Sequence, residues 1–367
     1  MTDAARASRG IRLAVDAMGG DHGPSEVVPG AIDHARAHPE DLVLLVGDEV
    51  RIREHAREPL PSNVELVAAS QVIEMHEHPA LALREKKDAS ITVGCDLVKA
   101  GRADAIVTAG HTGAAMAAAV LRIGRLAGVD RPALAVQMVR EGRPFVLLDI
   151  GANPDSTAEN LVQYARMGSI FAERVVGVPS PRVALLSIGE EKGKGDARIQ
   201  RATELLDASG LRFVGNVEGK DLVADMADVV VTDAVTGNVV IKFFEGLSTF
   251  IFDLFRAEFR RGIRGRLAYL LLRSGIGRIR QVFDYERAGG SPLLGVKGAV
   301  IITHGRARRR MVGFACAVAA DTARTGVPRL IADALREDAE RLASTGAVAG
   351  GAAAAATDEP ATLGSRP

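Results

Sequence analysis

The stretch Ile11-Arg-Leu-Ala-Val-Asp-Ala-Met-Gly-Gly-Asp-His22 joins a short apolar run to a polar turn that contains two adjacent glycines. The apolar run predicts a buried β-strand, and the Gly-Gly pair predicts a tight turn at the carboxyl end of that strand. Further runs rich in Val, Ile and Leu are 42–46, 105–108, 134–138, 145–148, 183–187, 229–231 and 300–302. Most are apolar throughout, which is typical of strands covered by helices on both faces.

Segments with helical spacing alternate with these strands. Helix start signals precede three of them: Pro24-Ser25 before 26–37, Asp88 before 89–100, and Asp196 before 197–208. The alternation predicts an α/β fold with a doubly wound, parallel or mostly parallel sheet between two helical layers. Because strand carboxyl ends line one crevice in such a sheet, we expect the turns that follow the strands to meet there.

The turns at these strand ends share glycines and small polar residues. They are 16–22, 109–113, 149–153, 215–219, 233–238 and 289–290. Their backbone N–H groups predict an anion-binding site. The candidate binding residues are Asp16, Gly19, Gly20, Asp21, Gly110, His111, Thr112, Gly113, Asn153, Gly237, Gly289 and Gly290. One such turn alone is as typical of a structural Asx turn, so it is the repetition that favours binding.

Two further segments add side chains suited to an anionic reaction. Lys194 lies between two glycines just before a predicted helix, where the helix dipole favours an anion, although a solvated loop lysine is the alternative. Asn238 offers a neutral donor to a developing oxyanion, and Lys242 follows one helical turn later. We therefore expect Lys194 and Asn238 to be catalytic and Lys242 to bind substrate.

Composition excludes several classes of protein. The 367 residues are 47% hydrophobic, enough for one large core or two lobes that share a sheet, and 46 basic residues balance 46 acidic ones. This balance gives no reason to expect a nucleic-acid partner. The two cysteines, Cys95 and Cys316, fit no metal-ligand spacing and suit a reducing compartment.

The ends of the chain and the lack of long apolar runs predict a cytosolic protein. The start has no signal-peptide pattern, and no run approaches the ~18 uncharged apolar residues of a membrane span. We expect residues 1–10 to be flexible, 11–345 to form the catalytic domain, and the Ala/Gly-rich residues 346–367 to be disordered.

Residues 246–283 depart from the α/β pattern. Six of the eleven phenylalanines lie between Phe243 and Phe259, and eight arginines with one glutamate lie in 256–280. This composition predicts a basic amphipathic helical segment, bent at Gly262, Gly265, Gly275 and Gly277. Two interpretations stay open and are compatible: packing on a second subunit, or contact with an anionic membrane surface.

Several familiar signatures are absent. No G-x-G-x-x-G follows the first strand, no G-x-S-x-G elbow occurs, and 215–220 is one residue short of a Walker A loop. His76-Glu77-His78 has the wrong spacing for a zinc pair on a helix. The sequence therefore predicts no metal, no cofactor and no covalent nucleophile.

Ten motifs in unbroken order over residues 11–325 resemble the PlsX family, the acyl-[acyl-carrier protein]:phosphate acyltransferases of bacterial phospholipid synthesis. They include Ala14-Val-Asp-Ala-Met-Gly-Gly-Asp21 and Thr108-Ala-Gly-His-Thr-Gly-Ala114, and the others are 86–90, 101–105, 131–133, 148–153, 215–218, 236–239, 289–295 and 304–305. The last motif adds His304 to the candidate binding residues. His111 stands where the family usually has Asn.

The resemblance implies a Rossmann-like α/β/α fold related to phosphate acetyltransferases and isocitrate-dehydrogenase-like enzymes, a homodimer, and loose membrane association. It implies transfer of a long-chain acyl group from acyl carrier protein to inorganic phosphate, giving acyl phosphate for a membrane glycerol-3-phosphate acyltransferase. Phosphate is already a charged nucleophile, so we expect direct attack on the thioester. Lys194 would then balance charge, Asn238 would stabilise the oxyanion, and the glycine-rich turns would hold phosphate.

Two other functions stay open on the sequence alone. One is a short-chain phosphate acyltransferase that uses coenzyme A, which would need no long apolar tunnel. The other is a non-catalytic membrane-binding scaffold, in which the glycine-rich turns would be merely structural.

Overall fold

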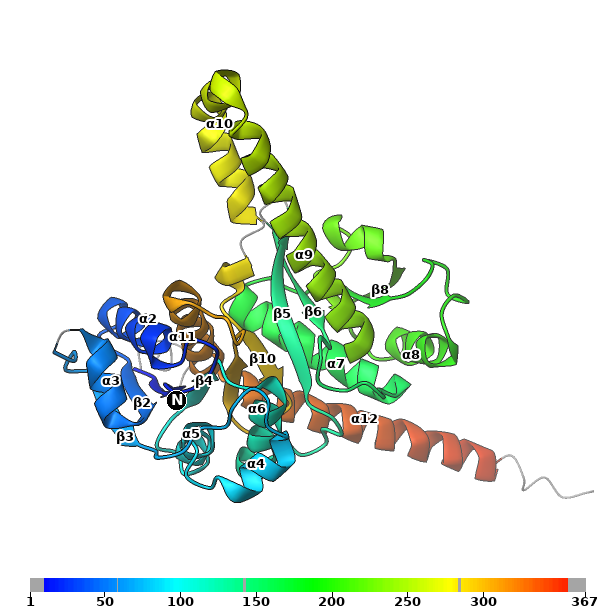
Figure 1. The fold of residues 1–367 in the computed structure, drawn as a ribbon. Helices are drawn as coiled ribbons and strands as arrows, with labels where there is room; N and C mark the ends of the chain where they lie inside the picture. The colour runs from blue at the N-terminus through cyan, green and yellow to red at the C-terminus, as the bar shows by residue number, and fades with distance from the viewer. Residues whose placement is uncertain (1–9, 58, 141–142, 283–284, 356–367) are drawn as a thin grey trace, which may run out of the picture.

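A computed structural model describes residues 10–57, 59–140, 143–282 and 285–355. Eleven strands form one sheet with helices on both faces, and a two-helix arm projects from this body (Figure 1). The strands are β1 (Arg12–Asp16), β2 (Leu42–Gly47), β3 (Val64–Ala68), β4 (Ala105–Thr108), β5 (Ala133–Arg140), β6 (Arg143–Leu148), β7 (Val183–Leu186), β8 (Phe213–Val217), β9 (Val229–Val231), β10 (Ser291–Leu294) and β11 (Ala299–Ile302).

The sheet order is β3-β2-β1-β4-β11-β10-β5-β6-β9-β7-β8, and most neighbours are parallel. The exceptions lie in the middle, where β10 is antiparallel to both β11 and β5, and β5 is antiparallel to β6. Consequently β6, β9, β7 and β8 run opposite to β1, β4 and β11. The expectation that all strands end at one edge is therefore wrong: each half of the sheet brings its own turns together.

Helices cover both faces. They are α2 (Pro24–Ala37), α3 (Glu49–Ala56), α4 (Pro79–Glu85), α5 (Ser90–Lys99), α6 (Thr112–Ala118), α7 (Ala158–Phe171), α8 (Ala197–Asp207), α9 (Ala234–Phe259), α10 (Gly262–Val282), α11 (Arg309–Arg324) and α12 (Val327–Ala355). Short 3-10 or π segments are η1 (Ala119–Ile123), η2 (Ala172–Val176), η3 (Gly219–Val223) and η4 (Tyr285–Ala288).

Alternating side chains of each strand fill separate cores, as strand geometry requires. In β1, Leu13 and Val15 pack with α2, α3 and α11, whereas Ala14 packs on the other face with α4, α5 and α6. In β6, Val146 and Leu148 pack with α7, α8 and α12. Both faces of the sheet are therefore covered, which confirms the α/β/α expectation.

The predicted strands are all present, and β3, β8 and β10 were missed. The Asp196 side chain caps α8 by accepting a hydrogen bond from the Ile199 N–H at 2.8 Å, as predicted. Asp88 does not cap α5: its carboxylate instead accepts bonds from the Ser70 backbone and hydroxyl. Gly215 lies inside β8, and Gly289-Gly290 precede β10 instead of following a strand.

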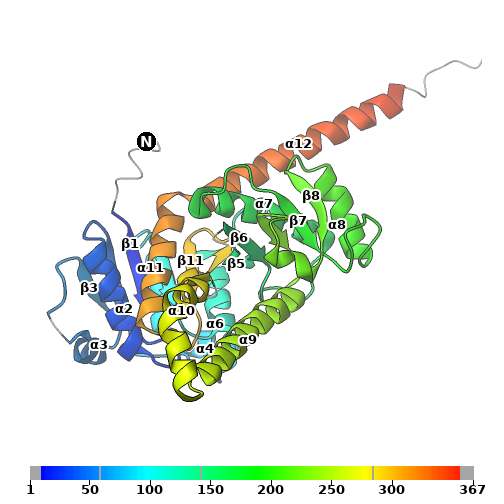
Figure 2. The same ribbon diagram turned by 90° about the horizontal axis from the view of Figure 1, so that it is seen from above.

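The predicted basic helical segment is the α9–α10 pair, which we call the arm (Figures 1 and 2). Its first helix begins at Ala234, well before the expected start at 246. The break between its helices falls at Gly262, with φ +61°, whereas Gly265, Gly275 and Gly277 lie within α10 and do not interrupt it.

Of the helices in the described part of the chain, α9 alone has the length and composition of a membrane span, with a mean hydropathy of 1.3 and 11% of its most apolar window buried. The sequence did not lead us to expect this. The predicted disordered tail begins inside α12, which continues to Ala355, and residues 1–9 and 356–367 lie outside the described residues.

Candidate active site

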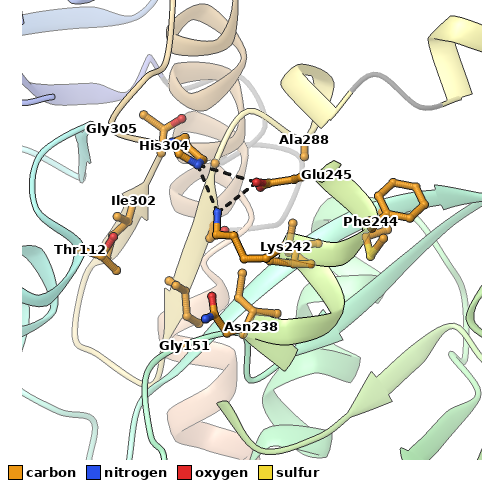
Figure 3. A pocket seen from close by; sticks show the side chains of 18 of the residues that line it. Thr112, Gly151, Asn238, Lys242, Phe244, Glu245, Ala288, Ile302, His304 and Gly305 are labelled. Carbon is orange, nitrogen blue, oxygen red and sulfur yellow. Dashed lines mark hydrogen bonds and ion pairs between the residues drawn. The ribbon is translucent and has the colours of Figure 1, made fainter. Parts of the chain in front are cut away.

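A cavity of about 880 Å³ lies along β5, between the turns after β1, β4 and β11 and the first turns of α9 (Figure 3). Strand register explains why the first three turns meet, because Thr108 of β4 is level with both Asp16 of β1 and Ile302 of β11. Six predicted site residues line the cavity: Asp21, Thr112, Asn238, Lys242, Gly290 and His304.

The charged end of the cavity is formed by Lys242, Glu245 and His304 (Figure 3). Lys242 Nζ lies 3.0 Å from Glu245 Oε2 and 3.2 Å from His304 Nε2. Arg306 also reaches Glu245 Oε2, at 3.2 Å, so this carboxylate, 14% exposed, pairs with Lys242 in the cavity lining and with Arg306 next to it.

His304 presents an N–H donor to the charged end of the cavity. Its Nδ1 accepts a hydrogen bond from the Arg306 backbone N–H at 3.3 Å, so in the neutral ring the proton is assigned to Nε2. Burial, followed by the nearby Lys242 ammonium, lowers the pKa of His304 and favours this neutral form. Two donors then face one another across 3.2 Å. An anionic oxygen that lies beside this pair, within hydrogen-bond distance of both nitrogens, would accept from both, so this end is suited to phosphate.

The rest of the cavity wall is largely apolar. Leu134, Val136 and Met138 project from β5, and Ile302 and Phe244 face the cavity from β11 and α9. Its volume is within the range of ~300–1,000 Å³ that is typical of small-molecule sites. A charged end joined to an apolar wall suits a ligand that is polar at the reacting end only.

Asp16 is buried and holds the turns after β1 and β4 together. Its carboxylate, in a residue 2% exposed, accepts a hydrogen bond from Thr108 Oγ1 at 2.7 Å, and burial raises its pKa. A Cβ at Gly19 would lie 2.6 Å from Asp16 Oδ2 and 2.8 Å from the Gly110 nitrogen. Glycine is therefore required where the turn after β1 packs on the turn after β4.

Asp149 has the same function at the end of β6, and the sequence did not single it out. Its carboxylate accepts bonds from the backbone N–H groups of Gly151, Ala152 and Asn153. The Asn153 amide donates to Asp149 Oδ2 at 2.9 Å and to the Pro132 carbonyl at 2.6 Å. Asn153 is thus engaged in shaping the turn. An Asp directly after a buried strand was the available signal.

The start of α9 rests against this second turn. A Cβ at Gly237 would lie 2.0 Å from the Asp149 carbonyl oxygen, so the helix approaches the turn closely because residue 237 has no side chain. Asp233 caps α9 by accepting from the Val235 and Thr236 N–H groups. These N–H groups are satisfied internally, and Asn238 is presented to the cavity beside Gly151 (Figure 3).

The remaining predicted residues lie near the lining but not in it. His111 caps α6, with Nδ1 accepting from the Gly113 N–H at 3.0 Å. Gly20 and Gly289 have positive φ and pack against the Gly305 carbonyl and the α11 backbone, respectively. These contacts are structural, and binding by these residues stays a prediction.

Lys194 is not among the described residues that line the cavity. It is exposed in the loop before α8, where its backbone N–H donates to the Glu191 carbonyl at 2.9 Å. The ammonium that the structure places in the cavity belongs to Lys242. Glu245 was missed, although its spacing of three residues from Lys242 in a helix is typical of an ion pair.

One group among the described residues has metal-ligand geometry, at the opposite edge of the sheet. Ligand atoms of His38, Glu40 and Asp41 lie within 4.8 Å of one another before β2. The Arg324 guanidinium already occupies Asp41, at 3.0 and 3.2 Å. A cation bound there would face this positive charge.

Comparisons with known proteins identify the family of the chain and agree with its fold. A family model described as "Fatty acid synthesis protein" matches residues 11–330. The chain is 48% identical over 311 residues to the phosphate acyltransferase of Nitratidesulfovibrio vulgaris, covering 84% of this chain and 90% of that protein. It is 45% identical over 319 residues to the phosphate acyltransferase of Gloeothece citriformis, covering 86% and 91%.

Solved structures share the fold at low sequence identity. A phosphotransacetylase from Streptococcus pyogenes superposes with a TM-score of 0.57 at 16% identity, covering 88% of this chain and 99% of that one. The EutD phosphotransacetylase from Staphylococcus aureus gives 0.55 at 16% identity with the same coverage. These matches confirm the expected relation to the phosphate acetyltransferase fold.

Proposed function

Because the chain belongs to the PlsX family and is a phosphate acyltransferase of lipid synthesis, we propose that it moves a long-chain acyl group from acyl carrier protein to inorganic phosphate. The product is an acyl phosphate. Membership of an enzyme family leaves no reason to retain the non-catalytic scaffold.

The observation that carries the proposal is the division of the cavity into a charged end and an apolar wall. Lys242 Nζ and His304 Nε2, 3.2 Å apart, are placed to donate to one phosphate oxygen that lies beside the pair. The β5 side chains Leu134, Val136 and Met138 extend away from that end and suit an alkyl chain. A short acetyl group would leave most of this wall unused.

In the proposed reaction a phosphate oxygen attacks the thioester carbonyl carbon. A carbon–oxygen bond forms, the carbon–sulfur bond breaks, and the carrier thiolate leaves and takes a proton from solvent. Fixing both reactants in one cavity lowers the entropic part of the barrier. The Asn238 amide is available to donate to the oxyanion, which strengthens as charge develops.

Lys194 keeps a proposed role in balancing charge on phosphate or thiolate. Since it lies outside the cavity lining, this role requires its loop to move towards the cavity. The loop is exposed, and Lys194 is bordered by Gly193 and Gly195, the latter with φ +95°. Lys242 is the alternative cation for the same task and is already in place.

The arm supports a proposed location at the cytoplasmic face of a membrane. Its exposed apolar side chains include Phe250, Ile263 and Leu271, which are 60%, 77% and 81% exposed. The helix α10 also carries several arginines, and each basic residue near anionic headgroups is worth about 1 kcal/mol. We propose peripheral binding because the first turns of α9 belong to the cavity wall.

The exposed apolar side chains of the arm also offer a surface to which a second copy of this chain could bind. A homodimer is therefore part of the proposal. The further partners are acyl carrier protein as donor and a membrane glycerol-3-phosphate acyltransferase as acceptor of the product. Membership of the PlsX family supports these proposed partners.

Trapping the product with hydroxylamine tests the function directly. We expect phosphate-dependent hydroxamate from palmitoyl-carrier protein and little from acetyl-coenzyme A. The reverse preference would establish the short-chain alternative. A lack of product with both donors would contradict the proposal.

A further inference from the structure

A second cavity, of about 1480 Å³, lies in the arm where α9, α10 and η4 meet, and we call it the arm groove. Its lining includes four aromatic residues, Phe252, Phe255, Phe259 and Tyr269. Aromatic rings follow one another along it. The Phe252–Phe255, Phe255–Phe259 and Phe259–Tyr269 centroids are 6.4, 6.3 and 5.7 Å apart.

The charges around these rings are mainly positive. Five arginines and two carboxylates line the groove. The carboxylates pair with Arg256, at 2.6 Å from Asp253, and with Arg310, at 3.1 Å from Glu286. Within the described residues no ion pair involves Arg260 or Arg266. The groove therefore combines an apolar floor with cationic groups, which suits an amphiphile that has an anionic head.

The arm groove adjoins the active-site cavity. Arg287 lines both, and α9 forms a wall of both: Glu245 faces the cavity, and Ser248 and Thr249 face the groove one turn later. The two cavities are therefore neighbours along one side of α9.

We propose that the arm groove binds a single-chain amphiphile with a phosphate head, the acyl phosphate product on its way out of the active-site cavity. This inference rests on the proposed function. Anionic phospholipid from a membrane offers the same head chemistry, but the lining residue shared with the active-site cavity favours the product as the source.

The test measures binding of decyl phosphate to the full-length protein by calorimetry, without lipid. Phe255→Ser removes part of the apolar floor of the groove, and the double variant Arg260→Gln/Arg266→Gln removes two of its positive charges. We expect each to weaken binding about tenfold, and decanol to bind more weakly than decyl phosphate. Phe250→Ser on α9 and Arg273→Gln on α10 change the same residue types outside the groove, and should bind decyl phosphate as the wild type does.

Equal affinity in all variants would overturn the proposal. So would a result in which only vesicles of anionic phospholipid distinguish the groove variants, because the groove would then be a membrane site. If Phe255→Ser separates a dimer without changing decyl phosphate binding, the groove is an interface between copies. The proposed function fails separately, through absence of hydroxamate from the wild-type enzyme, a result that involves no groove variant.

Discussion

Replacing Gly237 by Ala tests whether the site depends on the close approach of α9 to the turn after β6. The added methyl would lie 2.0 Å from the Asp149 carbonyl oxygen, 2.9 Å from its carbonyl carbon and 3.0 Å from Ile150 Cα. Since ordinary contact begins at 3.4 Å, the helix and the turn must separate by about 1.4 Å. Overpacking of this kind costs about 1–3 kcal/mol, partly offset by the ~1 kcal/mol by which Ala is favoured over Gly in a helix.

We therefore expect the free energy of unfolding of Gly237→Ala to fall by up to about 2 kcal/mol, measured by urea denaturation. Gly246→Ala is the matched control on the same helix, because its methyl meets nothing within 4 Å and should stabilise by up to ~1 kcal/mol. Activity of Gly237→Ala, measured by hydroxamate formation, should fall at least about tenfold, since Asn238 and Lys242 move with the helix. Full activity with the stability of the control variant would refute the reasoning.

Four further predictions concern the charged groups. Lys242→Ala should raise the KM for phosphate about tenfold or more, because it removes a charge-assisted contact, and an unchanged KM would exclude Lys242 from phosphate binding. Lys194→Ala should lower kcat strongly if its loop moves towards the cavity, and an unchanged kcat would exclude its catalytic role. Burial, followed by the nearby His38 and Arg324, lowers the pKa of His34 in the folded protein. The neutral His34 ring therefore contributes stability that is present above the unfolded pKa of ~6.5 and is lost as the pH falls below it. Urea midpoints at pH 7.5 and pH 5.5 should differ less in His34→Gln than in the wild type, and equal differences would contradict this. Arg264→Gln/Arg273→Gln should weaken sedimentation with anionic vesicles without affecting hydroxamate formation, and unchanged sedimentation would exclude lipid as the target of these arginines.

Periodicity predicted most of the sheet because its central strands are buried on both faces. β1, β4 and β9 appear in the sequence as continuous apolar runs, and these runs match the observed bounds closely. β3 and β8 were missed because both lie at sheet edges, where a strand needs fewer apolar side chains. β8 also contains Gly215, which indicates a turn when it is considered alone.

The direction of the strands could not be obtained from local patterns. The reversal at β5–β6 and the return of β10 between β11 and β5 depend on pairings between residues far apart in the chain. For the same reason, the sequence identified Lys242 and His304 separately but not their 3.2 Å contact. Local patterns predicted that the glycine-rich turns shape the site, but they did not distinguish the two roles of these glycines. Some line the cavity, such as Gly290, and others permit close packing of the backbone, such as Gly237.

The continuity of α9 has a consequence for how the two parts of the molecule can vary. One uninterrupted helix carries Asn238 and Lys242 at one end and Phe259 at the other. Each residue inserted between them would turn the arm by about 100° around the helix axis and advance it by about 1.5 Å relative to the cavity. If the apolar side of the arm is to keep its orientation relative to the cavity, the arm can therefore lengthen only in steps close to whole helical turns.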